Sequence, residues 1–135
     1  MPTVFTRIVN GEIPCYKVAE DDRFLAFLDI NPLAKGHTLV IPKKEIDYLF
    51  DVEDDLYSDM WLFSKKVALA IEKVVSCQRI GIAVLGLEVP HAHIHLVPIN
   101  SVYDIDFSKP KLKLSREEFQ LLAGRIAGEY ARSVQ

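Results

Sequence analysis

Residues 91–98 of this 135-residue chain read HAHIHLVP and decide its fold. Histidine occupies alternate positions here, at His91, His93 and His95, and apolar residues lie between them, at Ala92, Ile94 and Leu96. Neighbouring side chains of a strand point to opposite faces. The alternation therefore predicts a strand with three imidazoles on one face and, on the other, apolar side chains that pack into a helix-covered core.

The clustering of histidines calls for a chemical explanation. The chain has four histidines, and chance would place three of them in such a pattern in about one chain in a thousand. Three interpretations are open. The histidines could be hydrogen-bonded residues of a sheet without a chemical role, or ligands of a metal such as Zn²⁺. They could also supply one neutral imidazole that attacks phosphorus while its neighbours donate hydrogen bonds to the phosphoryl oxygens. The last interpretation uses all three and is favoured.

Patterns outside this stretch predict the rest of the sheet. Apolar and alternating runs indicate strands at 16–19, 24–28, 38–41, 79–85 and 91–99, and residues 5–13 indicate a short helical turn. No long helix lies between the last two strands, so we expect them to pair antiparallel.

Two longer helices are also predicted. Apolar residues recur every three or four positions over 56–74, which indicates a long amphipathic helix capped by Asp54 or Asp55. Ser115 and Glu118 form a capping box at the start of a C-terminal helix. The expected fold class is α+β: an antiparallel sheet of about five strands, with the long helix packed on one face and a C-terminal helix.

Composition limits the partners and the compartment. The length predicts a single domain over 1–135. The formal charge of −3, from 16 Lys+Arg and 19 Asp+Glu, favours neither nucleic acid nor an anionic membrane as a partner. No signal peptide or membrane span is recognisable, so a cytoplasmic location is expected. Cys15 and Cys77 are not spaced as a disulfide framework or a zinc motif.

The segment HAHIHLV resembles the signature of the histidine triad (HIT) superfamily, in which three histidines alternate with apolar residues. The similarity continues upstream through IVNGEIP at 8–14, FLDINP at 27–32 and GHTLVIPK at 36–43. The chain is most similar to the nucleotide-binding Hint-like branch, whose members are homodimers that hydrolyse the P–N bond of nucleoside phosphoramidates. The resemblance covers about residues 4–99 and leaves 100–135 as a C-terminal extension that contains a helix.

This resemblance implies a role for each histidine. His93 would be the nucleophile that forms a nucleotidyl intermediate. His91 and His95 would contact phosphate oxygens or orient His93, and His37 would lie behind the triad.

The resemblance also implies that Asp29 accepts the ribose hydroxyls of a purine nucleotide or nucleotide conjugate. The base and the nucleotide pocket would be lined by Val4, Phe5, Ile8, Ile13, Phe27, Ile30, Leu39 and Gly86. No cofactor is implied. A second function of a different class also fits: a nucleotide-binding or scaffolding protein with weak or no turnover.

Two departures from the family pattern affect these expectations. Thr3, Thr6 and Glu45 stand where many members have the Cys-x-x-Cys and histidine ligands of a structural zinc, so no metal is expected. Glu88 stands just before the triad, where members have a serine or threonine that assists the leaving group. Glu88 could be an exposed acid in the turn before Pro90, or a catalytic residue that faces the leaving-group side of the phosphate; the second interpretation is our prediction.

Overall fold

The computed structural model describes residues 2–135, and its centre is a five-stranded sheet in the order β1-β2-β3-β5-β4. All neighbouring strands are antiparallel. The strands are β1 (Lys17–Glu20), β2 (Phe24–Leu28), β3 (Thr38–Pro42), β4 (Arg79–Ala83) and β5 (Ile94–Ile99). The helices are α1 (Val4–Val9), α2 (Asp54–Val74) and α3 (Arg116–Ser133), with short 3₁₀ turns η1 (Leu49–Asp51) and η2 (Val102–Asp104). The predicted α+β fold class is confirmed.

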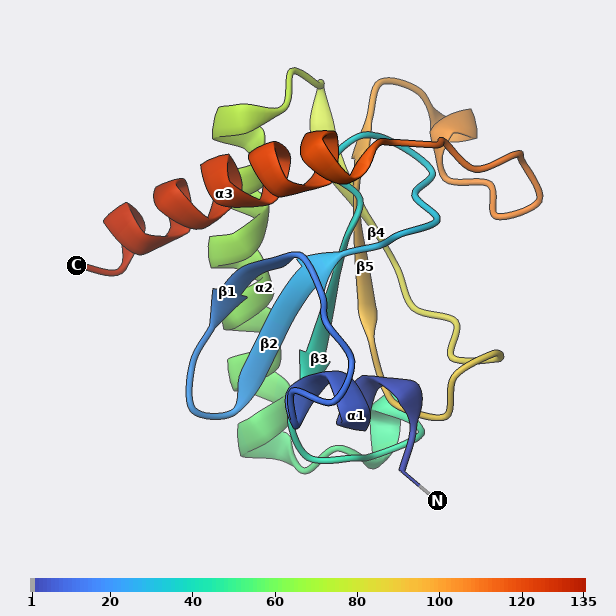
Figure 1. Ribbon diagram of the computed structural model, residues 1–135. Helices are drawn as coiled ribbons and strands as arrows, with labels where there is room; N and C mark the ends of the chain where they lie inside the picture. Colours follow the sequence, from blue (N-terminus) through green and yellow to red (C-terminus); the bar gives the residue numbers. More distant parts are fainter. Residues whose placement is uncertain (1) are drawn as a thin grey trace.

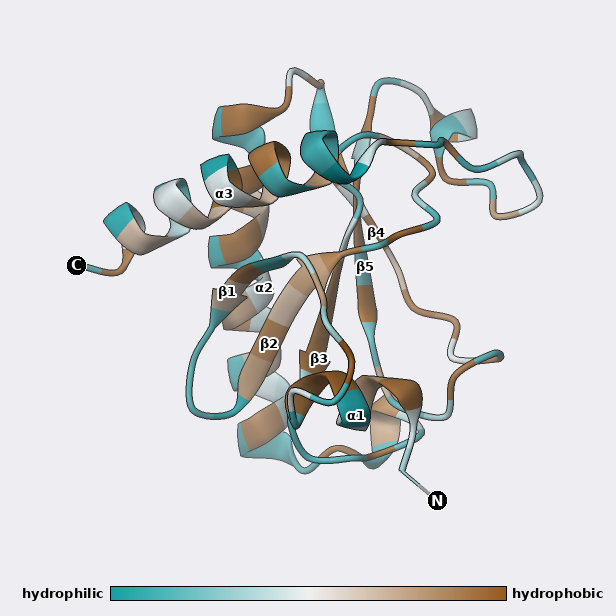
Figure 2. Cartoon of the chain, in the orientation of Figure 1, coloured by the Kyte–Doolittle hydropathy of each residue, from teal (hydrophilic) through white to brown (hydrophobic). Residues whose placement is uncertain are grey.

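Helices α2 and α3 cover one face of the sheet, and α3 crosses α2 (Figure 1). The main core lies between these helices and the strands, where hydrophobic residues concentrate (Figure 2). Ala92, Ile94 and Leu96 belong to this core and are at most 2% exposed. This confirms that the apolar side of the histidine segment packs under a helix.

The other face of the sheet carries a second, smaller core beneath α1. It consists of Phe5 from α1 and, from β2 and β3, of Leu25, Phe27, Leu39 and Ile41. The ring of Phe5 makes edge contacts with those of His91 and His93, at centroid distances of 5.8 and 5.1 Å. The histidine side of the segment therefore faces α1, away from α2.

Several predicted boundaries were wrong. Helix α1 ends at Val9 rather than at residue 13, β1 lies one residue later than predicted, and β3 extends to Pro42. Strand β5 begins at Ile94, because the N–H of Ala92 bonds to the carbonyl of Ile46 and that of His91 to Val89, outside the sheet. Strand β4 ends at Ala83 rather than at residue 85. Helix α2 begins at Asp54, and Glu53 is its N-cap residue but makes no side-chain capping bond. Neither Asp54 nor Asp55 therefore caps the helix.

Other local predictions are confirmed. Helix α3 begins at the predicted capping box, in which Ser115 Oγ accepts from the N–H of Glu118 and the Glu118 carboxylate accepts from the N–H of Ser115. Helix α3 packs along β1, where Tyr16 stacks on Phe119 with ring centroids 4.8 Å apart. Within residues 2–135, no helix combines the length and apolar character needed to cross a membrane.

Candidate active site

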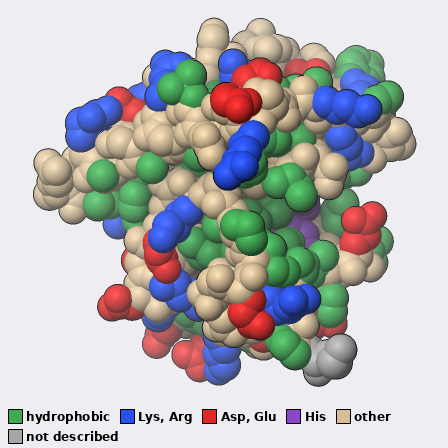
Figure 3. All heavy atoms as spheres, viewed as in Figure 1, with side chains coloured by type: hydrophobic (Ala, Val, Ile, Leu, Met, Phe, Trp, Pro, Cys, Tyr) green, Lys and Arg blue, Asp and Glu red, His purple; other side chains and the backbone are tan. Residues whose placement is uncertain are grey.

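A pocket of about 460 Å³ opens beside α1, on the histidine side of the sheet. Figure 3 shows histidine side chains at the bottom of a hollow among hydrophobic ones. The pocket is lined by most residues that sequence analysis selected: Val4, Phe5, Ile8, Ile13, Phe27, Asp29, Ile30, Leu39, Gly86, Glu88, His93 and His95. His37 and His91 lie behind this lining. The fold thus brings together side chains from α1, three strands and the loop before the triad.

The orientation of His93 follows from one hydrogen bond. Its Nδ1 lies 2.7 Å from the backbone carbonyl oxygen of His91. A carbonyl oxygen can only accept, so Nδ1 carries the hydrogen. In the neutral imidazole the lone pair is then on Nε2. His93 is 7% exposed and lines the pocket, so this nitrogen is a candidate nucleophile.

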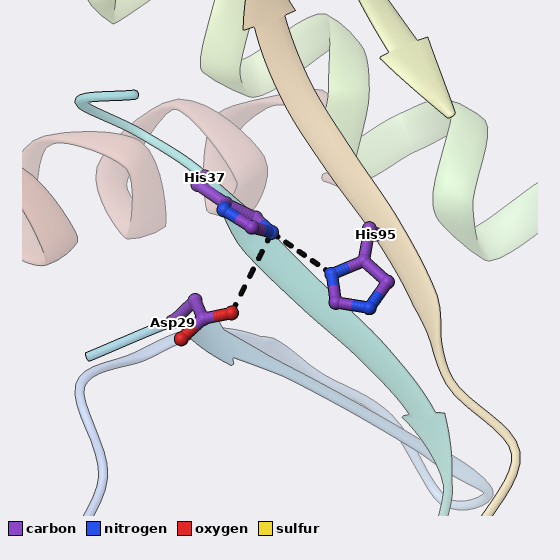
Figure 4. A group of neighbouring side chains, drawn as sticks. All are labelled: Asp29, His37 and His95. Carbon is purple, nitrogen blue, oxygen red and sulfur yellow. Dashed lines mark hydrogen bonds and ion pairs between the residues drawn. The ribbon is translucent and has the colours of Figure 1, made fainter. Parts of the chain in front are cut away.

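The orientation of His95 follows from a chain of two hydrogen bonds. The backbone N–H of Leu33 donates to His37 Nδ1 at 3.0 Å, which leaves the proton of neutral His37 on Nε2. That Nε2 lies 2.9 Å from His95 Nδ1 and donates to it (Figure 4). Neutral His95 therefore carries its proton on Nε2. The ring centroids of His93 and His95 are 4.9 Å apart. The lone pair on His93 Nε2 and the N–H of His95 Nε2 therefore belong to neighbouring rings.

Burial keeps His37 and His95 neutral. Desolvation lowers the pKa of His37 to about 3 and that of His95 to about 4. His37 is 1% exposed and His95 7%. At neutral pH both imidazoles are therefore uncharged, as the hydrogen-bond chain from Leu33 requires.

Asp29 follows β2 at the edge of the same pocket. Its Oδ1 accepts from the N–H of Asn31 at 2.8 Å, and its Oδ2 lies 3.6 Å from His37 Nε2 (Figure 4). Burial raises the pKa of this carboxyl, an effect opposed by the Asn31 hydrogen bond and by nearby charges that include Lys111. The carboxylate has lone pairs left to accept hydroxyl groups of a ligand.

The side chain of His91 does not line the pocket. Its Nε2 donates to the Pro42 carbonyl oxygen at 2.7 Å, and its Nδ1 lies 2.9 Å from Thr3 Oγ1. Burial lowers its pKa, so neutral Nδ1 accepts the Thr3 hydroxyl proton. Of the two roles predicted for His91, this geometry favours orienting His93 over contact with phosphate, because only its carbonyl reaches the His93 ring.

The positions of the family's structural zinc ligands form a hydrogen-bonded cluster in this chain. One carboxylate oxygen of Glu45 accepts from the Thr3 backbone N–H at 2.8 Å and from the Thr6 hydroxyl at 2.6 Å. Together with His91, these side chains meet at the start of α1. Neutral threonine hydroxyls replace the thiolates that zinc prefers. The residues present therefore do not fit a structural zinc ion.

A second group could be suspected of binding a cation: Asp29, His37 and His95 place ligand atoms within 4.8 Å of one another. His37, however, uses the lone pair on Nδ1 to accept the Leu33 N–H. Its Nε2 therefore carries a proton, which a metal would have to displace. The geometry fits a hydrogen-bond relay better than a metal centre.

Sequence analysis missed the contribution of the C-terminal extension to the pocket. Phe107 and Lys111 line it, and the ring of Phe107 lies edge-on to His95 at 4.8 Å. Leu85 and Leu87 also line it, on either side of Gly86. Gly86 has a φ of 72°, the left-handed conformation that favours glycine. No spacing or periodicity in residues 100–115 signals these contacts.

The fold and the pocket define a histidine-triad type of α+β protein, with alternate histidines on the face of an antiparallel sheet that carries the ligand-sized cavity. The sequence pattern of the HIT domain matches residues 10–102. The chain therefore belongs to the HIT domain family, and the resemblance found in the sequence is confirmed.

Relatives and solved structures agree with this assignment. A HIT-like protein of Borreliella burgdorferi is 39% identical, over 92% of this chain and 95% of its own length. An adenosine 5′-monophosphoramidase of Schizosaccharomyces pombe is 37% identical, over 96% of this chain and 98% of its own. The crystal structure of a HIT-like protein from Bartonella henselae superposes with a TM-score of 0.82 at 29% identity, covering 94% of this chain and 95% of that one.

Proposed function

We propose that this protein is a nucleotide-binding hydrolase or transferase that cleaves purine nucleoside 5′-monophosphate conjugates of the phosphoramidate type, through a nucleotidyl intermediate on His93. One observation carries the proposal: the lone pair of His93 Nε2 and the N–H of His95 Nε2 belong to adjacent rings of one pocket. A nucleophile and a hydrogen-bond donor are what attack on a phosphoryl group needs. The activity in the name of the Schizosaccharomyces pombe relative supports the same chemistry.

In the first step, His93 Nε2 attacks the α-phosphorus. The new N–P bond forms as the bond from phosphorus to the leaving amine breaks, and the amine nitrogen takes the electron pair together with a proton from solvent. His95 Nε2–H donates a hydrogen bond to a phosphoryl oxygen, where negative charge must be stabilised. The His91 carbonyl holds the Nδ1–H of His93 and stabilises the positive charge that the ring gains.

In the second step, water attacks the same phosphorus and gives up a proton to solvent as the N–P bond to His93 breaks. The nucleoside monophosphate leaves, and His93 recovers its lone pair. In a transferase, another nucleophile takes the place of water. This chemistry uses groups of the protein together with water and needs no cofactor.

The nucleoside would be held by the remaining pocket residues. The Asp29 carboxylate is suited to accept hydrogen bonds from both ribose hydroxyls, because it is an acceptor with several lone pairs. The rings of Phe5 and Phe27, 5.6 Å apart, offer apolar surface for a purine base. The same wall includes Ile8, Ile13, Ile30, Leu39 and Gly86.

A nucleotide-binding or scaffolding protein with weak turnover is the second candidate function. It is favoured by the loop before the triad, which carries Glu88 and has no serine or threonine over 85–90. Both functions require the pocket, but only the enzyme forms a covalent intermediate.

Intact-protein mass spectrometry after brief incubation with adenosine phosphoramidate distinguishes the two functions. The enzyme predicts an added nucleotidyl mass on wild-type protein after rapid quenching in alkaline denaturant, because a histidine N–P bond is labile in acid, and none on His93→Ala. A wild-type protein that binds AMP but gains no mass and releases no AMP would establish the binding function instead.

We also propose that the protein is a homodimer. Helix α3 packs along β1, which leaves β4 as the open edge of the sheet. Ile82 of β4 pairs with Leu96, whose side chain faces α2, and Ile82 is 48% exposed. Leu62 and Leu69 of α2 are also exposed. An open strand edge with apolar neighbours favours pairing with a second copy.

A further inference from the structure

The charges of the pocket do not by themselves favour an anionic ligand. Two carboxylates, Asp29 and Glu88, are among its lining residues. His37 and His95 are neutral at physiological pH because burial lowers their pKa values. A phosphate group would thus meet negative side chains and uncharged imidazoles. Opposing charge is required nearby if a nucleotide is to bind well.

Lys111 supplies that charge. Among the pocket-lining residues within the described range 2–135, it is the one lysine or arginine. It belongs to the extension beyond the matched family pattern, which ends at residue 102. Its charge acts on Asp29 and His37, since it contributes to lowering the pKa of each.

Backbone contacts hold Lys111 at the pocket. Its ammonium group donates to the carbonyl oxygens of Phe107 at 2.6 Å and Lys109 at 3.0 Å. An ammonium group has three hydrogens, so these two bonds position it and leave a third donor for a ligand. The N–H of Leu112 bonds to the Pro32 carbonyl at 2.9 Å, which ties this segment to the loop after Asp29.

The neighbours of Lys111 are compatible with ligand binding. The charge of Lys111 contributes to lowering the pKa of Asp106. The Asp106 carboxylate, however, accepts hydrogen bonds from the backbone N–H and the hydroxyl of Ser108. The ring of Phe107 contacts that of His95, and the ring centroids of Phe107 and His37 are 6.3 Å apart. The extension therefore presents one cation beside the histidines that are proposed to meet the phosphate.

We propose that Lys111 is a nucleotide-binding residue whose ammonium group binds an anionic phosphate oxygen of the ligand and balances Asp29 and Glu88. This inference rests on the proposed function, because it assumes a nucleotide in the pocket. The C-terminal extension then completes the site, and selects nucleotides over nucleosides. Lysine is a common phosphate ligand that acts as a compact charge.

Calorimetric titration of AMP and of adenosine tests this inference. The variants are Lys111→Met, which removes the charge, and Lys111→Arg, which keeps it. Lys109→Met is the matched control, because Lys109 lies in the same segment and bonds to the Tyr103 carbonyl, outside the pocket lining. We expect Lys111→Met to bind AMP about tenfold more weakly, equivalent to about 1.4 kcal/mol, and adenosine within twofold of wild type. Lys111→Arg and Lys109→Met should bind both ligands nearly as wild type does.

The outcomes separate this inference from the proposed function. A Lys111→Met variant that binds AMP as tightly as wild type would overturn the inference and leave the proposed function standing. Equal losses of affinity for AMP and adenosine in this variant would assign Lys111 a structural role and would also overturn the inference. A wild-type protein that binds neither ligand would overturn the proposed function itself.

Discussion

His93 Nδ1 donates a hydrogen bond to the backbone carbonyl of His91, two residues earlier in the chain, with 2.7 Å between nitrogen and oxygen. The bond fixes the tautomer of His93 and aims its lone pair through Nε2. The side chain of His91 is itself held by Thr3 and by the Pro42 carbonyl. The position of the His91 carbonyl therefore depends on contacts that lie outside the pocket.

His93→Ala is expected to lower turnover of adenosine phosphoramidate at least about 10³-fold, because it removes the attacking lone pair. Its circular dichroism spectrum should match that of wild type. Cys15→Ser, another change in the pocket lining, is the control and should keep most of the activity. A His93→Ala protein with a tenth of the wild-type rate would show that His93 is not the nucleophile.

Glu88→Ser should change the choice of leaving group. A carboxylate near the leaving group repels a second phosphate and favours a cationic amine. We expect the ratio of kcat/KM values to shift at least about tenfold toward a diphosphate-linked nucleotide and away from an amine-linked one, equivalent to about 1.4 kcal/mol. Glu53→Ser, on the exposed N-cap of α2, is the control. An unchanged ratio would make Glu88 an ordinary surface residue.

Stability should fall between pH 6.5 and pH 4. Histidine in the unfolded chain titrates near pH 6.5, whereas burial lowers the pKa of His37 to about 3 and that of His95 to about 4. The unfolded state therefore binds more protons in this interval, and the free energy of unfolding decreases as pH falls. Urea unfolding at pH 7 and pH 4.5 should differ by about 5 kcal/mol, from about 2.5 kcal/mol for each histidine.

His37→Asn tests the source of this pH dependence. It removes one of the two imidazoles whose pKa values are lowered furthest, while the groups around it, Asp29, His95 and Lys111, remain. The difference in unfolding free energy between the two pH values should shrink by about 2.5 kcal/mol relative to wild type. A difference equal to that of wild type would mean that carboxyl groups elsewhere cause the loss.

Elemental analysis of the purified protein should find no stoichiometric zinc. Hydroxyl groups of Thr3 and Thr6 stand beside Glu45 and His91, where zinc requires thiolates or imidazoles. Replacing the three together, by Thr3→Cys, Thr6→Cys and Glu45→His, should create a site with about one zinc per chain. One zinc per wild-type chain, with activity lost to a chelator, would favour a metal mechanism over His93.

Light scattering at micromolar concentration should give about twice the chain mass of 15.3 kDa. Ile82→Lys places a charge at the open edge of β4 and should shift the mass toward that of one chain. Leu121→Lys is the control, because Leu121 is exposed on α3, away from that edge. A wild-type mass of about 15 kDa would contradict the dimer.

The sequence by itself determined the features that repeat at a fixed period. The alternation of histidine and apolar residues over 91–97 separated a core face from a histidine face of the strand. The apolar residues that recur every three or four positions over 56–74 predicted the long helix. The pair Ser115 and Glu118 marked the start of α3, because a capping box is formed by residues three positions apart. Similarity to a family added most of the predicted pocket lining, and the family's pattern matches residues 10–102.

Only the tertiary structure decided how the histidines are used. His91 meets Thr3, 88 positions away, and His37 meets His95, 58 positions away, so their tautomers depend on partners that no local pattern indicates. The start of β5 at Ile94 likewise depends on a hydrogen bond from the Ala92 N–H to the Ile46 carbonyl. Lys111 reaches the pocket because Leu112 bonds to Pro32. Periodicity records which face a side chain takes, whereas long-range hydrogen bonds exist only once the chain has folded.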